Sequence, residues 1–140
     1  MTQASIFAPL FVLVLHSYVI GLLLLHERNR AVRNGLPPAY FRYNRGAKPP
    51  ESLLSVTQHY QNLFELPLLF YVLCLALYAT GLVDALNLGL AWAFVIGRLL
   101  HAYIHIVKNR LLWRRNIFLF SSGLLLLMWL EFGLRLFVTA

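Results

Sequence analysis

The amino-acid sequence predicts an all-α membrane protein that folds as a bundle of four transmembrane helices. Of its 140 residues 60% are apolar and the mean hydropathy is positive, whereas soluble domains contain about 45–50% apolar residues. One span takes about 20 residues, so four spans use nearly the whole chain. We therefore expect a single domain over residues 1–140, with helices at about 5–28, 52–80, 86–108 and 113–138.

The charge distribution agrees with this class. The net charge is +7, and a strongly basic chain can bind nucleic acid. Here the basic residues flank the apolar runs, where they set the orientation of the spans and contact anionic lipid headgroups. We therefore expect membrane lipids as partners, and no nucleic acid.

The first predicted helix contains the apolar run from Ile6 to Leu25. No basic segment precedes this run and it contains no clear small-residue cleavage site, so we interpret it as a retained span and not as a signal peptide. The helix ends where charge begins abruptly, in the stretch HERNRAVRNG, and Gly35 provides a stop signal.

The connection that follows, residues 34–51, reads NGLPPAYFRYNRGAKPPE. Its two Pro-Pro pairs and two glycines predict a loop, since neither residue type continues a helix. Aromatic and basic side chains alternate in its middle. Beside a membrane span, this composition favours a segment at the lipid interface over one that binds nucleic acid.

The second predicted helix begins near Ser52 or Ser55, either of which suits an N-cap. It runs to about Thr80, with Gly81 as its stop. Pro67 lies inside this run and is expected to kink the helix or to free a backbone carbonyl.

A polar face distinguishes this second helix. The stretch HYQNLFELP, residues 59–67, places imidazole, amide and carboxylate groups in a long apolar run. The amide and carboxylate side chains share roughly one side of a helix; they are Gln58, Gln61, Asn62 and Glu65. Such groups are costly in lipid, so this face should contact other helices or a water-filled cavity.

The third predicted helix carries another polar face, formed at spacings of three and four by Arg98, His101 and His105. At about 1.5 Å per residue, Arg98 lies roughly 15 Å inside the nearer helix end, too deep to reach the interface easily. Glu65 on the second helix lies at a comparable depth. We therefore expect a buried Glu65–Arg98 ion pair.

The basic residues also predict the orientation. Six of the twelve Lys and Arg residues lie in or beside the first connection and four in or beside the third, whereas the second contains only Asp84. The positive-inside rule then places the first and third connections in the cytoplasm. Both termini are expected on the non-cytoplasmic side, and the polar faces form a cleft toward the cytoplasm.

Three motifs, in this order and spacing, resemble the MAPEG family, the membrane-associated proteins in eicosanoid and glutathione metabolism. They are Asn62-x-x-Glu65 followed closely by Pro67, GRLLH at Gly97–His101, and the basic stretch Lys108–Arg115. The resemblance covers nearly the whole chain. Within the family, the third-helix block and its basic exit are most similar in spacing to microsomal prostaglandin E synthases.

The resemblance implies a homotrimer that binds glutathione between neighbouring subunits on the cytoplasmic side. Arg114 matches the arginine at the start of the fourth helix that holds the thiol ionised, so it is the catalytic candidate. Asn62 and Glu65 would contact the peptide, with His101 beside it. The full set of cofactor-binding candidates is Gln61, Asn62, Glu65, Arg98, His101 and His105, and no metal ligand is expected.

Some positions depart from the family pattern. Gln58 and Gln61 stand where glutathione-using members usually carry arginines, and an amide holds a carboxylate more weakly than a guanidinium does. His105 stands where a tyrosine is typical. The basic residue expected at the end of the first helix is either His26 or Arg30.

The activity that the resemblance implies is that of a glutathione-dependent transferase or peroxidase, acting on a lipophilic electrophile that enters from the bilayer. A second interpretation is a non-catalytic trimer of the same fold that binds lipid or acts as a scaffold, since a fold does not determine an activity. A third is an unrelated small membrane protein whose buried charges serve ion passage.

Overall fold

The computed structural model describes residues 2–108 and 110–139, and every regular element in this part of the chain is helical. The single turns η1 and η2 are of the 3-10 and π type. In chain order the elements are η1 (Gln3–Ile6), α1 (Phe7–Arg33), α2 (Tyr40–Tyr43), α3 (Glu51–Asn62), α4 (Leu66–Thr80), α5 (Ala85–Tyr103), η2 (Ile104–Lys108) and α6 (Leu111–Thr139).

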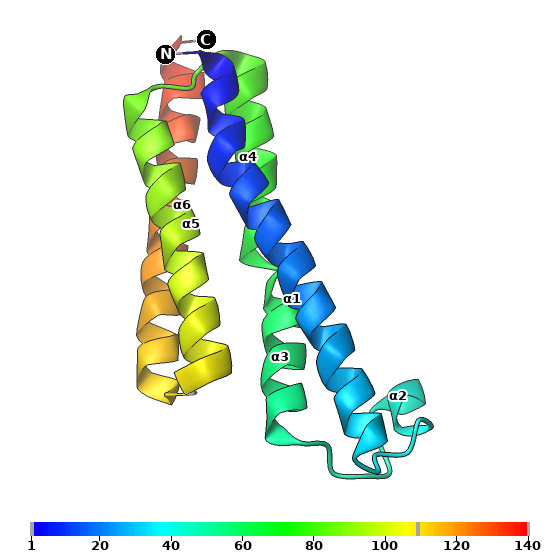
Figure 1. Ribbon diagram of the computed structural model, residues 1–140. Coiled ribbons are helices and arrows are strands. Elements are labelled where there is room, and N and C mark those ends of the chain that lie inside the picture. Colours follow the sequence, from blue (N-terminus) through cyan, green and yellow to red (C-terminus); the bar gives the residue numbers. More distant parts are fainter. Residues whose placement is uncertain (1, 109, 140) are drawn as a thin grey trace.

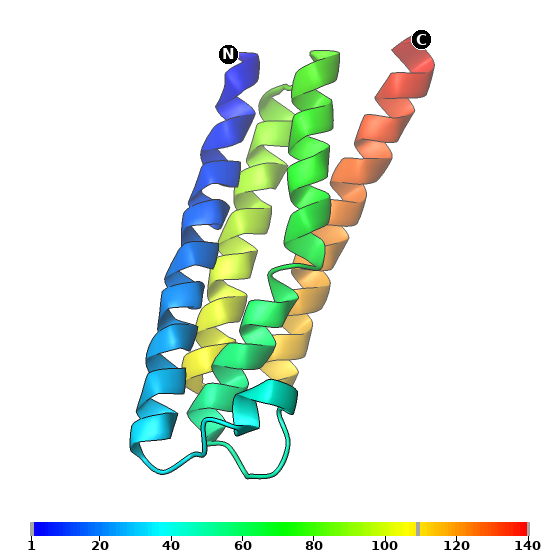
Figure 2. The same cartoon turned by 90° about the vertical axis from the view of Figure 1, so that its right-hand side faces the viewer.

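Four helical segments are long and apolar enough to cross a membrane, which confirms the predicted fold class. They are Gln3–Arg33, Glu51–Thr80, Ala85–Lys108 and Leu111–Val138. The segments run side by side in an elongated bundle, as Figures 1 and 2 both show. Both termini lie at one end of the bundle, and α2 with its flanking loop lies at the other (Figure 1).

The second span consists of two helices and not of one kinked helix (Figure 2). α3 ends at Asn62, and α4 begins at Leu66 with Pro67 in its first turn. Proline lacks an N–H and has a fixed φ, so it suits the start of a helix better than the interior. The chain therefore starts a new helix at Leu66, with Pro67 in its first turn, and residues 63–65 form a break inside the span.

Two apolar clusters form the interior of the bundle. The larger lies toward the termini and includes Phe70 of α4 and Phe94 of α5, whose rings stack with centroids 4.7 Å apart. The smaller lies toward α2 and includes Leu24 of α1 and Val56 of α3. Buried polar residues, among them His59, Arg98, His101 and His105, lie between these clusters.

α5 and α6 approach each other closely at Gly97. A Cβ added at this position would lie 2.6 Å from Oγ of Ser121 on α6, much closer than any real contact. Small residues permit such approaches between membrane helices. Gly97 thereby fixes the position of α6 relative to the polar face of α5.

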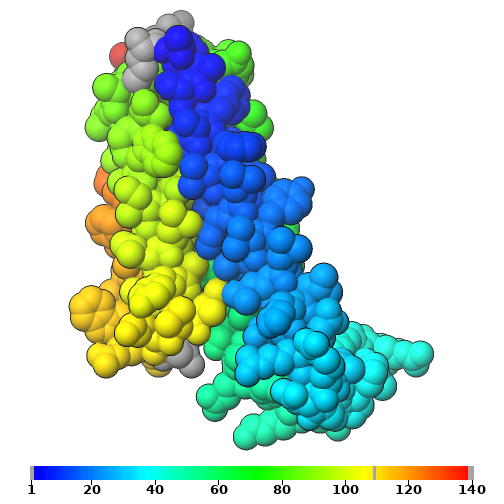
Figure 3. Space-filling view, in the orientation of Figure 1, coloured from blue at the N-terminus to red at the C-terminus, as the bar shows by residue number. Residues whose placement is uncertain are grey.

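Polar contacts hold both ends of the bundle. At the terminal end, Asp84 pairs with Arg135 of α6 at 2.5 Å. At the other end, Ser52 donates a hydrogen bond of 2.7 Å to the buried carboxylate of Glu27, which ties α3 to α1. The loop between α1 and α3 projects past this end (Figure 3).

The start of α3 differs from the prediction. The helix begins at Glu51, and Pro50 occupies the cap position, so neither Ser52 nor Ser55 is the N-cap. The hydroxyl of Ser52 is engaged with Glu27 instead. The Ser52 side chain therefore forms a contact between α3 and α1 and does not cap its own helix.

Candidate functional site

A polar cavity of about 420 Å³ opens between the α3–α4 break, the second half of α5 and the first turns of α6. Its wall combines an amide, a carboxylate, an imidazole and two guanidinium groups with apolar side chains. The lining residues are Asn62, Glu65, His101, Leu111, Leu112, Arg114, Arg115 and Phe118. Three of the four spans therefore contribute to one site.

The break in the second span places the amide and the carboxylate. α3 ends at Asn62, whose carbonyl accepts a hydrogen bond of 3.3 Å from Nη2 of Arg98. Glu65 lies just before α4 with φ −100° and ψ −99°, outside the helical and extended regions. This irregular segment turns both Asn62 and Glu65 toward α5 and α6.

The predicted ion pair between Glu65 and Arg98 is wrong. Arg98 is 0% exposed, whereas Glu65 is exposed, and their charged groups do not come within the 4.0 Å of an ion pair. The guanidinium of Arg98 instead lies over the ring of Phe118, with Cζ 5.8 Å from the ring centroid. The physical reason is the helix break, which removes Glu65 from the regular helical spacing that the prediction assumed.

The start of α6 provides the two guanidinium groups. Adjacent residues point about 100° apart on a helix, yet Arg114 and Arg115 both line the polar cavity. Arg115 also donates from Nε to Oδ1 of Asn116 at 3.4 Å. With Glu65 as the acidic residue in this wall, positive charge is in excess, and the cavity favours an anionic ligand.

Three of the predicted binding residues do not line the polar cavity. Gln61 lines a separate cavity of about 170 Å³, together with Arg28 of α1. Arg98 lies behind the wall, where it contacts the carbonyl of Asn62. His105 is buried in the core, with its ring centroid 5.6 Å from that of His101.

Neither basic candidate at the end of α1 lines the polar cavity. His26 is exposed. Arg30 pairs with the carboxylate of Glu27 at 3.5 Å. Both candidates therefore lie outside the wall of the polar cavity in the single chain.

The structure adds residues that the sequence did not assign to the site. Phe118 is apolar and carries no signal in the sequence, yet its ring packs on His101 with centroids 5.8 Å apart. His59 is fully buried beside His101, with centroids 5.5 Å apart. An imidazole in an apolar helix was a visible signal for His59, but its position lies off the face that contains Asn62 and Glu65.

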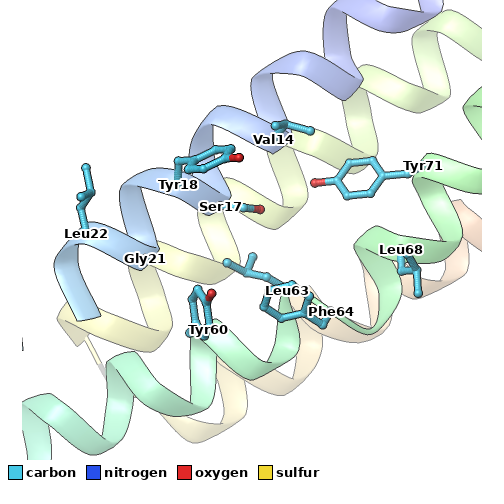
Figure 4. A pocket seen from close by; sticks show the side chains of 10 residues that line it. All are labelled: Val14, Ser17, Tyr18, Gly21, Leu22, Tyr60, Leu63, Phe64, Leu68 and Tyr71. Carbon is cyan, nitrogen blue, oxygen red and sulfur yellow. The ribbon is translucent and has the colours of Figure 1, made fainter. Parts of the chain in front are cut away.

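A third cavity, of about 480 Å³ and called the apolar cavity below, lies between α1, α3 and α4 (Figure 4). Hydroxyl groups of Ser17 and Tyr71 point into it in Figure 4. Leu63 and Phe64 of the break line this cavity. The lining residues are Val14, Ser17, Tyr18, Gly21, Leu22, Tyr60, Leu63, Phe64, Leu68 and Tyr71. Since the neighbouring residues of the break line the polar cavity, this short segment separates the two cavities.

The chain matches the model of one known protein family over nearly its whole length. A family model described as the MAPEG family matches residues 6–134. The matched range includes every residue that lines the polar and apolar cavities. Searches of curated proteins and of solved structures gave no match.

Proposed function

Because this chain belongs to the MAPEG family, we propose that it is a glutathione-dependent transferase or peroxidase acting on a lipophilic electrophile. The family includes glutathione transferases and peroxidases. The observation that carries the proposal is the polar cavity, where Asn62, Glu65, His101 and Arg114 come together. Polar groups gathered inside a membrane span mark a functional site by default, because they are costly there.

The chemistry of the cavity wall matches the groups of glutathione. The guanidinium groups of Arg114 and Arg115 suit its carboxylates, since charge-assisted hydrogen bonds to guanidinium are strong and directional. The carboxylate of Glu65 suits its ammonium group. The side chain of Asn62 offers both a donor and an acceptor to a peptide bond.

Arg114 is the proposed catalytic residue. A thiolate is a much stronger nucleophile than a thiol, and an adjacent cation lowers the thiol pKa. Arg114 lies near the start of α6 and is half-buried in the cavity wall, where its charge is screened less than on an open surface. Its role would be to hold the glutathione sulfur ionised at neutral pH.

The lipophilic substrate would approach from the membrane side. The apolar cavity has room for part of such a molecule, and Ser17 and Tyr71 offer hydroxyl groups inside it. Leu63 and Phe64 form its wall next to the residues that line the polar cavity. This arrangement supports a reaction in which a polar thiol and an apolar partner come from different sides of the break.

We further propose that the protein is a homotrimer in which glutathione binds between subunits. The family resemblance supports this assembly, as do the many exposed apolar side chains, which can face lipid or a neighbouring copy. Native mass spectrometry from mild detergent should show a trimer, and only monomers or dimers would contradict the proposal.

The orientation is also a proposal. The two highly basic connections lie at the end of the bundle opposite to the termini (Figure 1), and the positive-inside rule places that end in the cytoplasm. Cysteine variants at Thr2 and at Arg110 would then be labelled from opposite sides of a sealed membrane. Labelling of Thr2→Cys from the cytoplasmic side alone would reverse the model.

Thiolate absorbance in the ultraviolet tests the catalytic proposal. A free thiol has a pKa of about 8.5, so glutathione bound at pH 7 should show this absorbance only beside a cation. Arg114→Ala should abolish the absorbance and depress conjugation with a model electrophile, while some glutathione still binds through Asn62 and Glu65. Arg114→Lys should restore part of it, because a cation returns without the planar guanidinium.

Arg115→Ala is the matched control for this experiment. It removes the same charge from the same wall, but its guanidinium also contacts Asn116. The absorbance should therefore fall less than in Arg114→Ala. If the wild type forms no thiolate at millimolar glutathione, the enzyme proposal fails.

The alternative is a non-catalytic membrane trimer that binds lipid or acts as a scaffold. One observation favours it: the apolar cavity is larger than the polar cavity, and no charged residue lines it. A lipid retained through purification, together with the absence of thiolate formation, would make this the better account.

A further inference from the structure

Four histidines come together in the core of the bundle, next to the polar cavity. The ring centroid of His59 on α3 lies 5.5 Å from those of both His101 and His105. It lies 5.9 Å from that of His16 on α1. These four residues are called the histidine cluster below. One of the four, His101, also lines the polar cavity, so the histidine cluster is in contact with the wall of that cavity.

Five of the eight ring nitrogens of this cluster are buried without a hydrogen-bond partner among the described residues. His59 is 0% exposed, and both of its nitrogens lack a partner. The other buried nitrogens without a partner are His16 Nε2, His101 Nδ1, His105 Nδ1, and Nε and Nη1 of the adjacent Arg98. A neutral imidazole has one N–H donor and one acceptor nitrogen, so each of these rings requires partners.

The histidine cluster forms a polar layer between the two apolar clusters of the interior. On α1, His16 lies between Leu13 of the larger cluster and Leu24 of the smaller one. On α3, His59 follows Val56 of the smaller cluster by one turn. Apolar packing above and below cannot satisfy these nitrogens. Their partners must therefore lie within the layer itself.

A metal ion suits this layer poorly. Within residues 2–108 and 110–139, no group of three or more His, Cys, Asp or Glu side chains is arranged to hold one. Two cations, the buried Arg98 guanidinium and the Arg114 guanidinium, act electrostatically on the histidines of this layer. A divalent cation near them in a low-dielectric interior would be strongly repelled.

Water suits the layer well. Buried polar groups in folded proteins are almost always hydrogen-bonded to protein or to ordered water. An interior water needs about two to four polar partners, and the histidine cluster with Arg98 offers enough for more than one molecule. Water can both donate and accept, so it satisfies the N–H and the acceptor nitrogen of each ring.

We propose that the histidine cluster binds a small group of ordered internal water molecules that enter from the polar cavity at His101. From His101 the waters hydrogen-bond His105 and His59, and from His59 they reach His16, whose ring contacts that of His59. Together, the waters and imidazoles form a continuous path along which protons exchange between the cavity and the core, a role that imidazole performs well. The site does not depend on the proposed function, because it exists whether or not glutathione binds.

Solid-state NMR of the full chain in phospholipid bilayers, with ¹⁵N-labelled histidine rings, tests this proposal. Magnetisation transferred from water should reach the ring nitrogens of His59 and His16, as it reaches those of the exposed His26. The methyl group of Met128, 0% exposed in the larger apolar cluster, is the dry control and should receive none. Each histidine ring is assigned in the wild-type protein by correlating its ring nitrogens with its own backbone signals.

Two outcomes of this measurement would overturn the proposal. Transfer to His26 and His101 without transfer to His59 would show that the core is dry. Stoichiometric Zn²⁺ that removes the water signal at His59 and shifts its ring nitrogens would show a metal site instead. The wild-type spectrum decides both points, so the test survives even if a variant fails to fold.

The entrance at His101 has its own test. His101→Phe should slow the exchange of the His59 ring proton in D₂O, because an apolar ring of similar size then closes the path. His26→Phe is the matched control and should leave that exchange unchanged. Unchanged exchange at His59 in folded His101→Phe would show that water enters elsewhere and would overturn the proposed path.

Discussion

Arg98 of α5 donates a hydrogen bond from Nη2 to the backbone carbonyl of Asn62, across 3.3 Å, at the point where α3 ends. Carbonyl groups at the end of a helix lack an intrahelical donor and carry partial negative charge. A buried guanidinium beside them is therefore favourable even without a carboxylate in contact. This hydrogen bond joins the second and third spans at the wall of the polar cavity.

The first prediction follows from this contact. Arg98→Leu should destabilise the protein by about 1–3 kcal/mol, because it leaves the Asn62 carbonyl without its donor. Glu65→Gln should have little effect on stability, since the Glu65 carboxylate is exposed. Thermal or chemical unfolding in detergent, measured for both variants and their combination, should give a coupling energy of at most about 1 kcal/mol, because Glu65 attracts Arg98 only through a longer-range coulombic interaction and not through a direct ion pair. A coupling of several kcal/mol, as expected for a broken buried ion pair, would show that the two side chains form a direct ion pair after all.

A second prediction concerns the close approach of α5 and α6. Gly97→Ala should destabilise the bundle by about 1–3 kcal/mol, because the new methyl group would lie 2.6 Å from Oγ of Ser121. The double variant Gly97→Ala/Ser121→Ala should recover most of this loss, since the Cβ of Ser121 is 3.6 Å away and can stay. Unfolding midpoints in one detergent provide the comparison.

Gly89→Ala is the matched control on the same helix. Nothing lies within 4 Å of a Cβ added at Gly89. Alanine is the better helix former by about 1 kcal/mol, so this variant should be neutral or more stable. Equal effects of Gly89→Ala and Gly97→Ala would mean that the contact with Ser121 does not limit the packing.

The third prediction concerns pH and the connection between α4 and α5. Burial opposes ionisation of Asp84, but hydrogen bonds from the Asn87 N–H at 2.8 Å and from Arg135 outweigh it and hold the pKa of Asp84 below its ordinary value of 3.8. The ionised carboxylate therefore stabilises the fold above that ordinary value. This contribution is lost as the pH falls through the lower pKa of the folded state.

Asp84→Asn isolates the charge, since asparagine is an equally good N-cap. The variant should have a lower melting temperature than the wild type at pH 7. The difference should shrink as the pH falls below 3.8 and through the folded-state pKa. A difference that stays constant from pH 7 to the acid limit would show that the charge of Asp84 does not contribute.

Much of the fold was predictable because its signals are strong. Four apolar runs, each bounded by charge, glycine or proline, predicted the spans. The polar side chains of Asn62, Glu65, His101 and Arg114 were conspicuous in apolar surroundings, and the structure brings them to one cavity. Their function in ligand binding stays a prediction.

The errors have a common physical cause. Spacing predicts a shared face only on an unbroken helix, and residues 63–65 interrupt the second span. For this reason Gln61 and Glu65, four residues apart, line different cavities. The contact of Phe118 with Arg98 could not be predicted, because it depends on how α6 packs against α5.

The last prediction concerns the site between subunits. In one protomer, Gln61 lines the small cavity beside Arg28, on a different side of α3 from the polar cavity. An arginine placed there would start from outside the polar cavity of its own protomer, so we expect it to contact the ligand only if the ligand is held between two protomers. If glutathione binds between subunits, Gln61→Arg should tighten its binding by about tenfold, the effect of one added charge-assisted hydrogen bond of about 1.5 kcal/mol.

Thr80→Arg is the control for this measurement, because it adds the same charge at the opposite end of the bundle. Isothermal titration of glutathione into wild type, Gln61→Arg and Thr80→Arg in one detergent gives the three affinities. The wild type should bind weakly, since Gln58 and Gln61 offer only neutral amides. Tighter binding by Gln61→Arg alone would support a site shared between protomers, because the structure of one chain keeps that residue away from the polar cavity. Equal affinities in all three proteins would contradict a shared site that includes position 61, even if Arg114 still holds a thiolate.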